Sequence, residues 1–162
     1  MKNYNIIFTV LFAAFFILNI NNSNAKNRFH AKLPDKNFNL SSKSKTVIME
    51  KGETYRIKAK LRENRYYFFS AEGNRKRACL QYRIIDPNNN NEIIFDNSAY
   101  EFINNITFLN KVERNVIIEI ITMPCYKSKK RTNNVKVLFA NKKMKGNEEF
   151  DVNRNYNLYA VK

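Results

Sequence analysis

The sequence predicts an all-β domain, built as an antiparallel β-sandwich of about eight short strands. Segments rich in Tyr, Phe, Ile and Val recur at short spacing, as is typical of pleated structure. Turn signals such as "EKGE", "EGNR", "DPNNNN" and "LNKVERN" separate them, and no helical periodicity lasts long enough to compete. Short strands with regular turns pack as two sheets around one core.

The clearest strand is the stretch "TYRIKAKLR", residues 54–62, in which apolar and basic residues alternate strictly. This period of two predicts a half-buried strand. Its basic side is typical of a solvated face rather than a ligand groove, because such a strand must show polar groups to water. The other expected strands cover residues 46–50, 65–71, 79–85, 92–96, 105–109, 115–123 and 135–140.

The two ends of the chain differ from the middle. Residues 6–20, "IIFTVLFAAFFILNI", follow Lys2 and precede polar "NNSNA", which predicts a signal peptide over residues 1–25 with cleavage between Ala25 and Lys26. A transmembrane anchor is the alternative, but the run is shorter than the roughly 20 apolar residues that span a bilayer. We expect a secreted, periplasmic or cell-envelope protein with no membrane anchor after cleavage.

Three further segments complete the expected organisation. Residues 26–44 are polar with isolated apolar residues, which predicts a leader with little structure of its own. Residues 45–140 hold the sandwich. Residues 141–162 form a basic C-terminal tail, whose final "YNLYAV" is either unstructured or a short edge strand.

Four stretches together carry a recognisable pattern: "VIMEKGETYRIKAKL", "RYYFFSAEG", "IIDPNNNNEIIFDN" and "NITFLN…RNVIIEIITM". Residues 45–140 thereby resemble the bacterial pre-peptidase C-terminal (PPC) type of β-sandwich, which is similar in outline to the GOLD-like jelly rolls. The resemblance implies a jelly-roll-like fold, export and a role in binding or secretion. The chain departs from the pattern by carrying four asparagines in place of the usual Gly-rich turn and by lacking a protease domain.

Catalytic and metal sites find little support in the residue types. The single histidine, His30, lies in the leader, so the common serine and cysteine nucleophiles lack a base. Two cysteines and one distant histidine cannot form a four-ligand zinc site. We therefore expect no enzyme, no cofactor and no metal. A hydrolase with a carboxylate pair is the alternative; the carboxylates to consider are Asp86, Glu92, Asp96, Glu101, Glu113 and Glu119, which we interpret as charge partners.

The asparagine-rich hairpin is the one place where calcium deserves consideration. Carboxylates and asparagines between Asp86 and Asp96 offer hard oxygen ligands, but their spacing is not that of a calcium loop. An Asp-Pro-Asn sequence initiates turns, and asparagine tolerates the unusual backbone dihedrals of a turn. We interpret this segment as a turn.

Charge and cysteines point to one end of the predicted sandwich. The chain has 29 basic and 14 acidic residues, a formal net charge of +15, which suits an anionic partner. Two cysteines in an exported protein suggest a disulfide, Cys79 to Cys125, with two buried free thiols as the alternative. If successive strands alternate in direction, both cysteines lie at the same end. That end would gather seven cations: Arg75, Lys76, Arg77, Lys127, Lys129, Lys130 and Arg131.

These features predict a non-enzymatic binding or accessory module. The seven cations could bind an anionic glycan, a lipid head group at the envelope surface or a protein partner through charge-assisted hydrogen bonds. Alternatively they are solvated loop charges on a structural domain. Nucleic acid ranks below these partners, because the aromatic residues alternate within strands and resemble core rather than stacking platforms.

Overall fold

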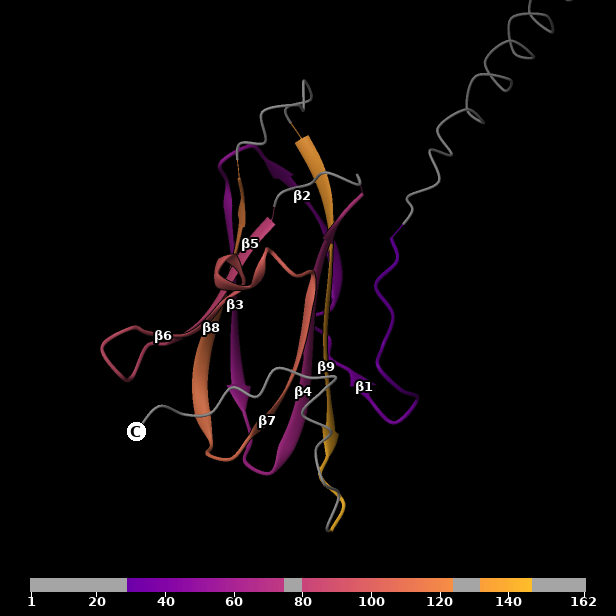
Figure 1. The fold of residues 1–162 in the computed structure, drawn as a ribbon, viewed down its shortest axis with the longest axis vertical. Coiled ribbons are helices and arrows are strands. Elements are labelled where there is room, and N and C mark those ends of the chain that lie inside the picture. Colours follow the sequence, from indigo (N-terminus) through magenta and orange to yellow (C-terminus); the bar gives the residue numbers. More distant parts are fainter. Residues whose placement is uncertain (1–28, 75–79, 124–131, 147–162) are drawn as a thin grey trace, which may run out of the picture.

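The protein folds as two antiparallel β-sheets packed face to face, as the sequence predicted (Figure 1). This computed structural model describes residues 29–74, 80–123 and 132–146. The strands are β1 (Asn39–Leu40), β2 (Lys45–Glu50), β3 (Thr54–Leu61), β4 (Arg65–Gly73), β5 (Leu80–Asp86), β6 (Glu92–Asp96), β7 (Asn105–Asn110), β8 (Arg114–Thr122) and β9 (Thr132–Lys143). A single-turn 3₁₀ helix, η1 (Asn97–Tyr100), follows β6. Among the described residues, no helix is long and apolar enough to span a membrane.

The strand order is that of a jelly roll. The antiparallel pairs β2/β9, β3/β8, β4/β7 and β5/β6 are nested in the sequence, each pair inside the one before. Alternate pairs go to different sheets: sheet A contains β1 and β2 on β9, then β4 and β7, whereas sheet B has the order β3-β8-β5-β6. This nesting places two Greek-key halves around one core, which is the jelly-roll arrangement.

The main core lies between the two sheets and is filled by alternate residues of their strands. On β3, Ile57, Ala59 and Leu61 are buried while the basic residues between them are exposed. On sheet A, the ring of Tyr67 stacks between those of Phe108 and Phe139, at centroid distances of 5.8 and 5.7 Å. Burial of such large rings, together with the aliphatic residues around them, stabilises the sandwich.

The asparagine-rich hairpin between β5 and β6 is a turn, as predicted. Asp86 Oδ1 accepts a hydrogen bond from the Asn88 N–H at 3.0 Å, and the Asn89 N–H donates to the Asp86 carbonyl. Asn90 and Asn91 adopt positive φ angles of 50° and 57°, a region that asparagine enters more readily than most residues. Within the described ranges, no group of three or more potential metal-ligating side chains occurs.

Residues 29–44 are the described part of the segment expected to hold little structure of its own, and they pack against sheet A; we call them the N-terminal strap. The strap contributes β1 and buries Phe38 to 5% exposure, edge-on against Phe68 at 6.3 Å. A second apolar cluster forms there from Phe38, Tyr66, Phe68, Leu138 and Ala140.

Polar contacts fix the strap at its first residues and near its middle. The Glu72 carboxylate accepts hydrogen bonds from the N–H groups of His30 and Ala31, at 2.7 and 2.6 Å. Lys142 pairs with Asp35 at 3.3 Å and lies over the Phe38 ring. The physical reason for the strap is that β4 and β9 are apolar on both faces, so sheet A needs a cover on its outer side as well.

Candidate functional site

The residues that the sequence singled out as an anion site and as a disulfide lie outside the described residues. They are Arg75, Lys76, Arg77, Lys127, Lys129, Lys130, Arg131, Cys79 and Cys125. The strand ends that flank them are described, and their positions can be compared with the prediction.

Those flanking strand ends meet at one end of the sandwich, which we call the loop end. Gly73, the last residue of β4, pairs with Val135 near the start of β9. Leu80, the first residue of β5, pairs with Thr122, the last of β8. In Figure 1 this is the upper end of the molecule. The prediction that the strand beginning near Cys79 starts where the strand over residues 115–123 ends is therefore confirmed.

The turn between β2 and β3 ties the two sheets together at the loop end. Thr122 of sheet B donates its hydroxyl to the Glu50 and Glu53 carbonyls, and its carbonyl accepts the Gly52 N–H at 2.8 Å. Glu50 in turn pairs with Thr132 in sheet A. Gly52 has a φ of 83°, which favours glycine at this turn. The strand ends of both sheets are thus held close to one another by hydrogen bonds.

The basic strand β3 differs from the loop end because two of its cations already pair with glutamates, one on β8 and one just before it. Arg56 lies directly opposite Glu119 and pairs with it at 2.7 Å, and Lys60 pairs with Glu113 at 2.6 Å. Lys58 is exposed and has no carboxylate partner among the described residues. The face is solvated, as predicted, and two of its cations, Arg56 and Lys60, are balanced by carboxylates.

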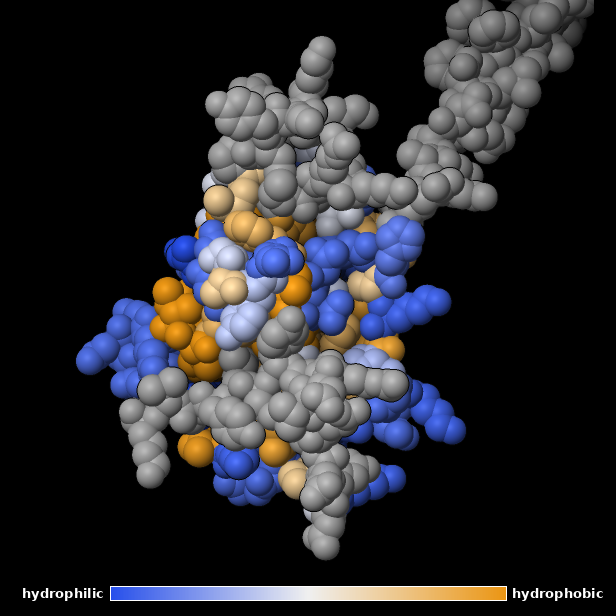
Figure 2. Space-filling model, in the orientation of Figure 1, coloured by the Kyte–Doolittle hydropathy of each residue, from blue (hydrophilic) through white to orange (hydrophobic). Residues whose placement is uncertain are grey.

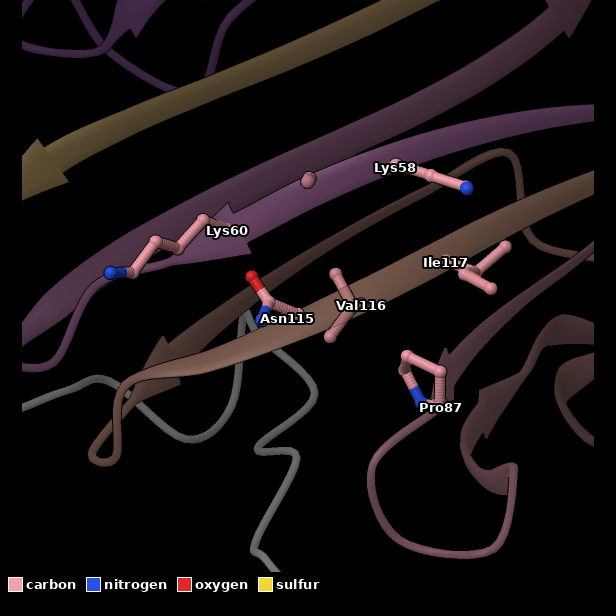
Figure 3. A pocket seen from close by; sticks show the side chains of 7 residues that line it. Lys58, Lys60, Pro87, Asn115, Val116 and Ile117 are labelled. Atoms are coloured by element: carbon pink, nitrogen blue, oxygen red, sulfur yellow. The ribbon is translucent and has the colours of Figure 1, made fainter.

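A shallow hollow of about 400 Å³ opens on the outer side of sheet B (Figure 3). It lies between β3, the first half of β8 and Pro87, which follows β5. Its lining is mainly apolar, with two lysines and one amide at the rim: Lys58, Ala59, Lys60, Pro87, Asn115, Val116 and Ile117. Its volume falls within the usual range of small binding sites.

Exposed apolar side chains occur on the same sheet. Figure 2 shows hydrophobic side chains at the surface near β6, bordered by hydrophilic ones. Ile93 on β6 is 51% exposed, and Tyr100 and Phe102 in the following loop are about as exposed. Tyr100 stacks on the core ring of Phe95 at 5.2 Å. Singly exposed apolar residues of this kind are common on soluble proteins.

The stretch "FDN", residues 95–97, has a role that the sequence did not reveal: Asp96 and Asn97 form a cluster of hydrogen bonds that we call the polar knot. Phe95 enters the core. Asp96 accepts hydrogen bonds from Gln81, Arg83 and Ser98 at 2.7 to 3.0 Å. Burial alone would raise the pKa of Asp96, but the hydrogen bonds from Ser98, Gln81 and Arg83 outweigh it and hold that pKa below its ordinary value.

Asn97 is the buried member of this knot, at 1% exposure. Its Oδ1 accepts the Tyr82 N–H at 2.8 Å, and its Nδ2 donates to the carbonyls of Leu80 and Ile103 at 3.0 and 3.1 Å. Because β6 ends at Asp96, the Asn97 side chain takes the place of a strand beside the first residues of β5. No signal separates this asparagine from the many others in the sequence.

The carboxylates considered for catalysis mostly act as charge partners, as interpreted from the sequence. Four of the six form ion pairs, and a fifth, Glu92, accepts a hydrogen bond from Asn89 within the turn. The ion pairs are Asp86–Arg114, Asp96–Arg83, Glu113–Lys60 and Glu119–Arg56.

No protein-family model, curated protein or solved structure matches the chain. The resemblance to PPC-type sandwiches therefore stays a prediction, and the case for function depends on the residues themselves.

Proposed function

We propose that this chain is an exported, non-catalytic β-sandwich module that binds an anionic partner, a glycan or lipid head group of the cell envelope or exterior, at the loop end. The strongest support for this location is the strand pairing at the loop end, where Gly73 pairs with Val135 and Leu80 pairs with Thr122. The two strongly basic segments of the sequence are joined to these strand ends, three cations in residues 75–77 and four in residues 127–131. Cations brought together from two connections can engage one polyanion.

The charge balance on β3 supports the loop end over the basic strand as the binding surface. A polyanion on β3 would have to compete with Glu119 for Arg56 and with Glu113 for Lys60. Alternate cations along one strand also lie about 7 Å apart and point to open solvent. Loop side chains can converge on one ligand, whereas strand side chains in a row cannot.

A disulfide between Cys79 and Cys125 would fix the geometry of this end. Cys79 precedes Leu80 by one residue and Cys125 follows Thr122 by three, and Leu80 and Thr122 are paired. The bond would close a loop of 46 residues in the sequence, for which the chain-entropy model gives about 4 kcal/mol of stabilisation.

Binding of the mature protein, residues 26–162, to immobilised heparin tests the proposal, with uncharged dextran as the matched control. We expect retention on heparin that weakens steeply with salt, and none on dextran, because counterion release drives such binding. Equal retention on both matrices, or none on heparin at low salt, would favour a structural domain whose basic surface binds nothing.

A further inference from the structure

Three isoleucines form an apolar strip across the outer side of sheet B, which we call the isoleucine strip. The strand register places Ile117 of β8 opposite Ile85 of β5, and Ile85 opposite Ile93 of β6. A neighbour of each in the chain packs on the core, so the three side chains face outward. Ile117 and Ile85 are half-buried, and Ile93 is 51% exposed. Ile93 is thus the outer end of a continuous apolar surface that crosses three strands.

A cation stands at the other end of this strip. Lys58 of β3 lies opposite Ile117 in the register, on the same outer face, and is exposed. It has no carboxylate partner among the residues that the structure describes. The next row of the sheet is different, because its cations are paired with carboxylates, as Arg56–Glu119 and Arg83–Asp96. The strip therefore begins at an unbalanced positive charge and ends in apolar surface.

The hollow on sheet B lies where this charge and the strip meet. Lys58 and Ile117 both line it, and Pro87 lines the side where β5 has ended. Figure 3 shows the side chains of Lys58 and Lys60 pointing in opposite directions, with Lys58 extending toward the Ile117 end of the hollow. Lys60 also pairs with Glu113 at 2.6 Å. A ligand in the hollow would therefore meet the ammonium of Lys58 and then the isoleucine strip.

A single-chain amphiphile with an anionic head matches this order of groups. Its head can meet Lys58 while its tail lies across the strands on the three isoleucines. The distance from β3 to β6 is three strand spacings, about 14 Å, which is roughly the length of an extended ten-carbon chain. A glycan could engage Lys58 but would leave the apolar strip in water, whereas an acyl chain covers it.

We propose that the outer face of sheet B is a second binding site, which takes a free single-chain carboxylate such as a fatty acid. The carboxylate lies at Lys58 in the hollow, and the unbranched tail lies along the isoleucine strip. The residues of this site are separate from the cations at the loop end. The site stands independently of the proposed polyanion binding.

Titration of the ¹⁵N-labelled protein with decanoate below its micelle concentration, followed by NMR, tests this site. We expect shift changes at residues 58, 85, 93 and 117 and at their neighbours. Butanoate carries the same head without the tail and should not produce them at equal concentration. From hexanoate to decanoate the affinity should rise at least about twofold per added methylene, because each one covers more of the strip. Beyond decanoate the gain should level off.

Two lysine variants and one isoleucine variant place the head and the tail. Lys58→Met keeps an unbranched side chain and removes its charge, so decanoate should bind about fivefold more weakly. Lys60→Met is the matched control and should change the affinity less than twofold, because Lys60 points away and pairs with Glu113. Ile93→Thr should weaken decanoate binding about threefold and leave hexanoate unchanged, because the shorter chain does not reach β6.

Four results would overturn the proposal. They are no shifts at the strip with millimolar decanoate, equal binding of butanoate and decanoate, equal losses for Lys58→Met and Lys60→Met, and shifts at these residues with anionic phospholipid vesicles but not with decanoate. The last would identify the face as a bilayer contact. Shifts at the strip that change on dilution of the protein alone would likewise contradict the proposal and place a second copy there. The comparison of butanoate with decanoate leaves the protein unaltered, so its result does not depend on a variant's folding.

Discussion

Replacing Asn97 by alanine should destabilise the fold far more than an ordinary polar substitution. The change removes three hydrogen bonds, to the Tyr82 N–H and to the carbonyls of Leu80 and Ile103, at a position that is 1% exposed. Each such bond contributes about 1 kcal/mol net, and buried groups left unpaired add to the loss. We expect the free energy of unfolding to fall by about 3 to 5 kcal/mol, with a melting temperature lower by roughly 10 to 20 °C.

Urea unfolding followed by circular dichroism measures this loss. Asn89→Ala is the matched control, because Asn89 lies exposed in the preceding turn and its side chain donates a hydrogen bond to Glu92 within the same turn. We expect that variant to stay within about 0.5 kcal/mol of the wild type. Asn97→Asp keeps an oxygen that accepts the Tyr82 N–H, but it replaces the Nδ2 donor by an oxygen that faces two carbonyls. We expect it to lower the free energy of unfolding at least as much as Asn97→Ala does. A loss below about 1 kcal/mol for Asn97→Ala would refute the reasoning.

Three further predictions concern the strap, acid stability and the cysteines. Phe38→Ala should lower stability by about 3 kcal/mol in the same urea assay and expose residues 29–44 to protease, because the ring packs on Phe68; resistance equal to the wild type would contradict the strap's packing. The pKa of Asp96 is lowered on folding, so its contribution to stability is complete above the ordinary value of about 3.9 and is lost as pH falls through the folded-state pKa. Urea unfolding from pH 7 to pH 2 should therefore show that the wild type's advantage over Asp96→Asn in free energy of unfolding narrows below about pH 4. A difference that stays constant with pH would contradict this role of Asp96. Non-reducing peptide mapping of exported protein should link Cys79 to Cys125; two alkylatable thiols, or Cα atoms much more than about 7 Å apart, would exclude the bond.

Local patterns in the sequence were sufficient to predict the sandwich. Each of the eight expected strands occurs, with bounds that differ by at most three residues over the described ranges, because alternation and turn residues act over a few positions. The two-residue β1 was not predicted, since so short a strand has no period to detect. The resemblance to PPC-type domains implied a jelly-roll-like outline but no strand order, so the nested pairing of the strands is known from the structure alone.

The strap and the polar knot could not be predicted because they depend on distant contacts. Phe38 is one apolar residue in a polar segment, and its burial requires the outer face of β4 and β9. A signal was nevertheless present: "YYFFSA" and "VLFA" lack alternation, which indicates that sheet A is covered on both faces. The role of Asn97 depends on where β6 ends, which propensity does not fix to a single residue.

The location of polyanion binding is tested most directly by comparing two triple variants of equal charge on heparin. One replaces Arg75, Lys76 and Arg77 by glutamine, and the other replaces Arg56, Lys58 and Lys60. Binding at the loop end predicts that the first variant loses affinity, with a salt dependence shallower by about two in log–log slope. The second should bind nearly as the wild type does, and both should keep nearly the same melting temperature, because exposed charges contribute little to folding. Equal losses for the two variants would contradict the account, since net charge alone would then govern binding.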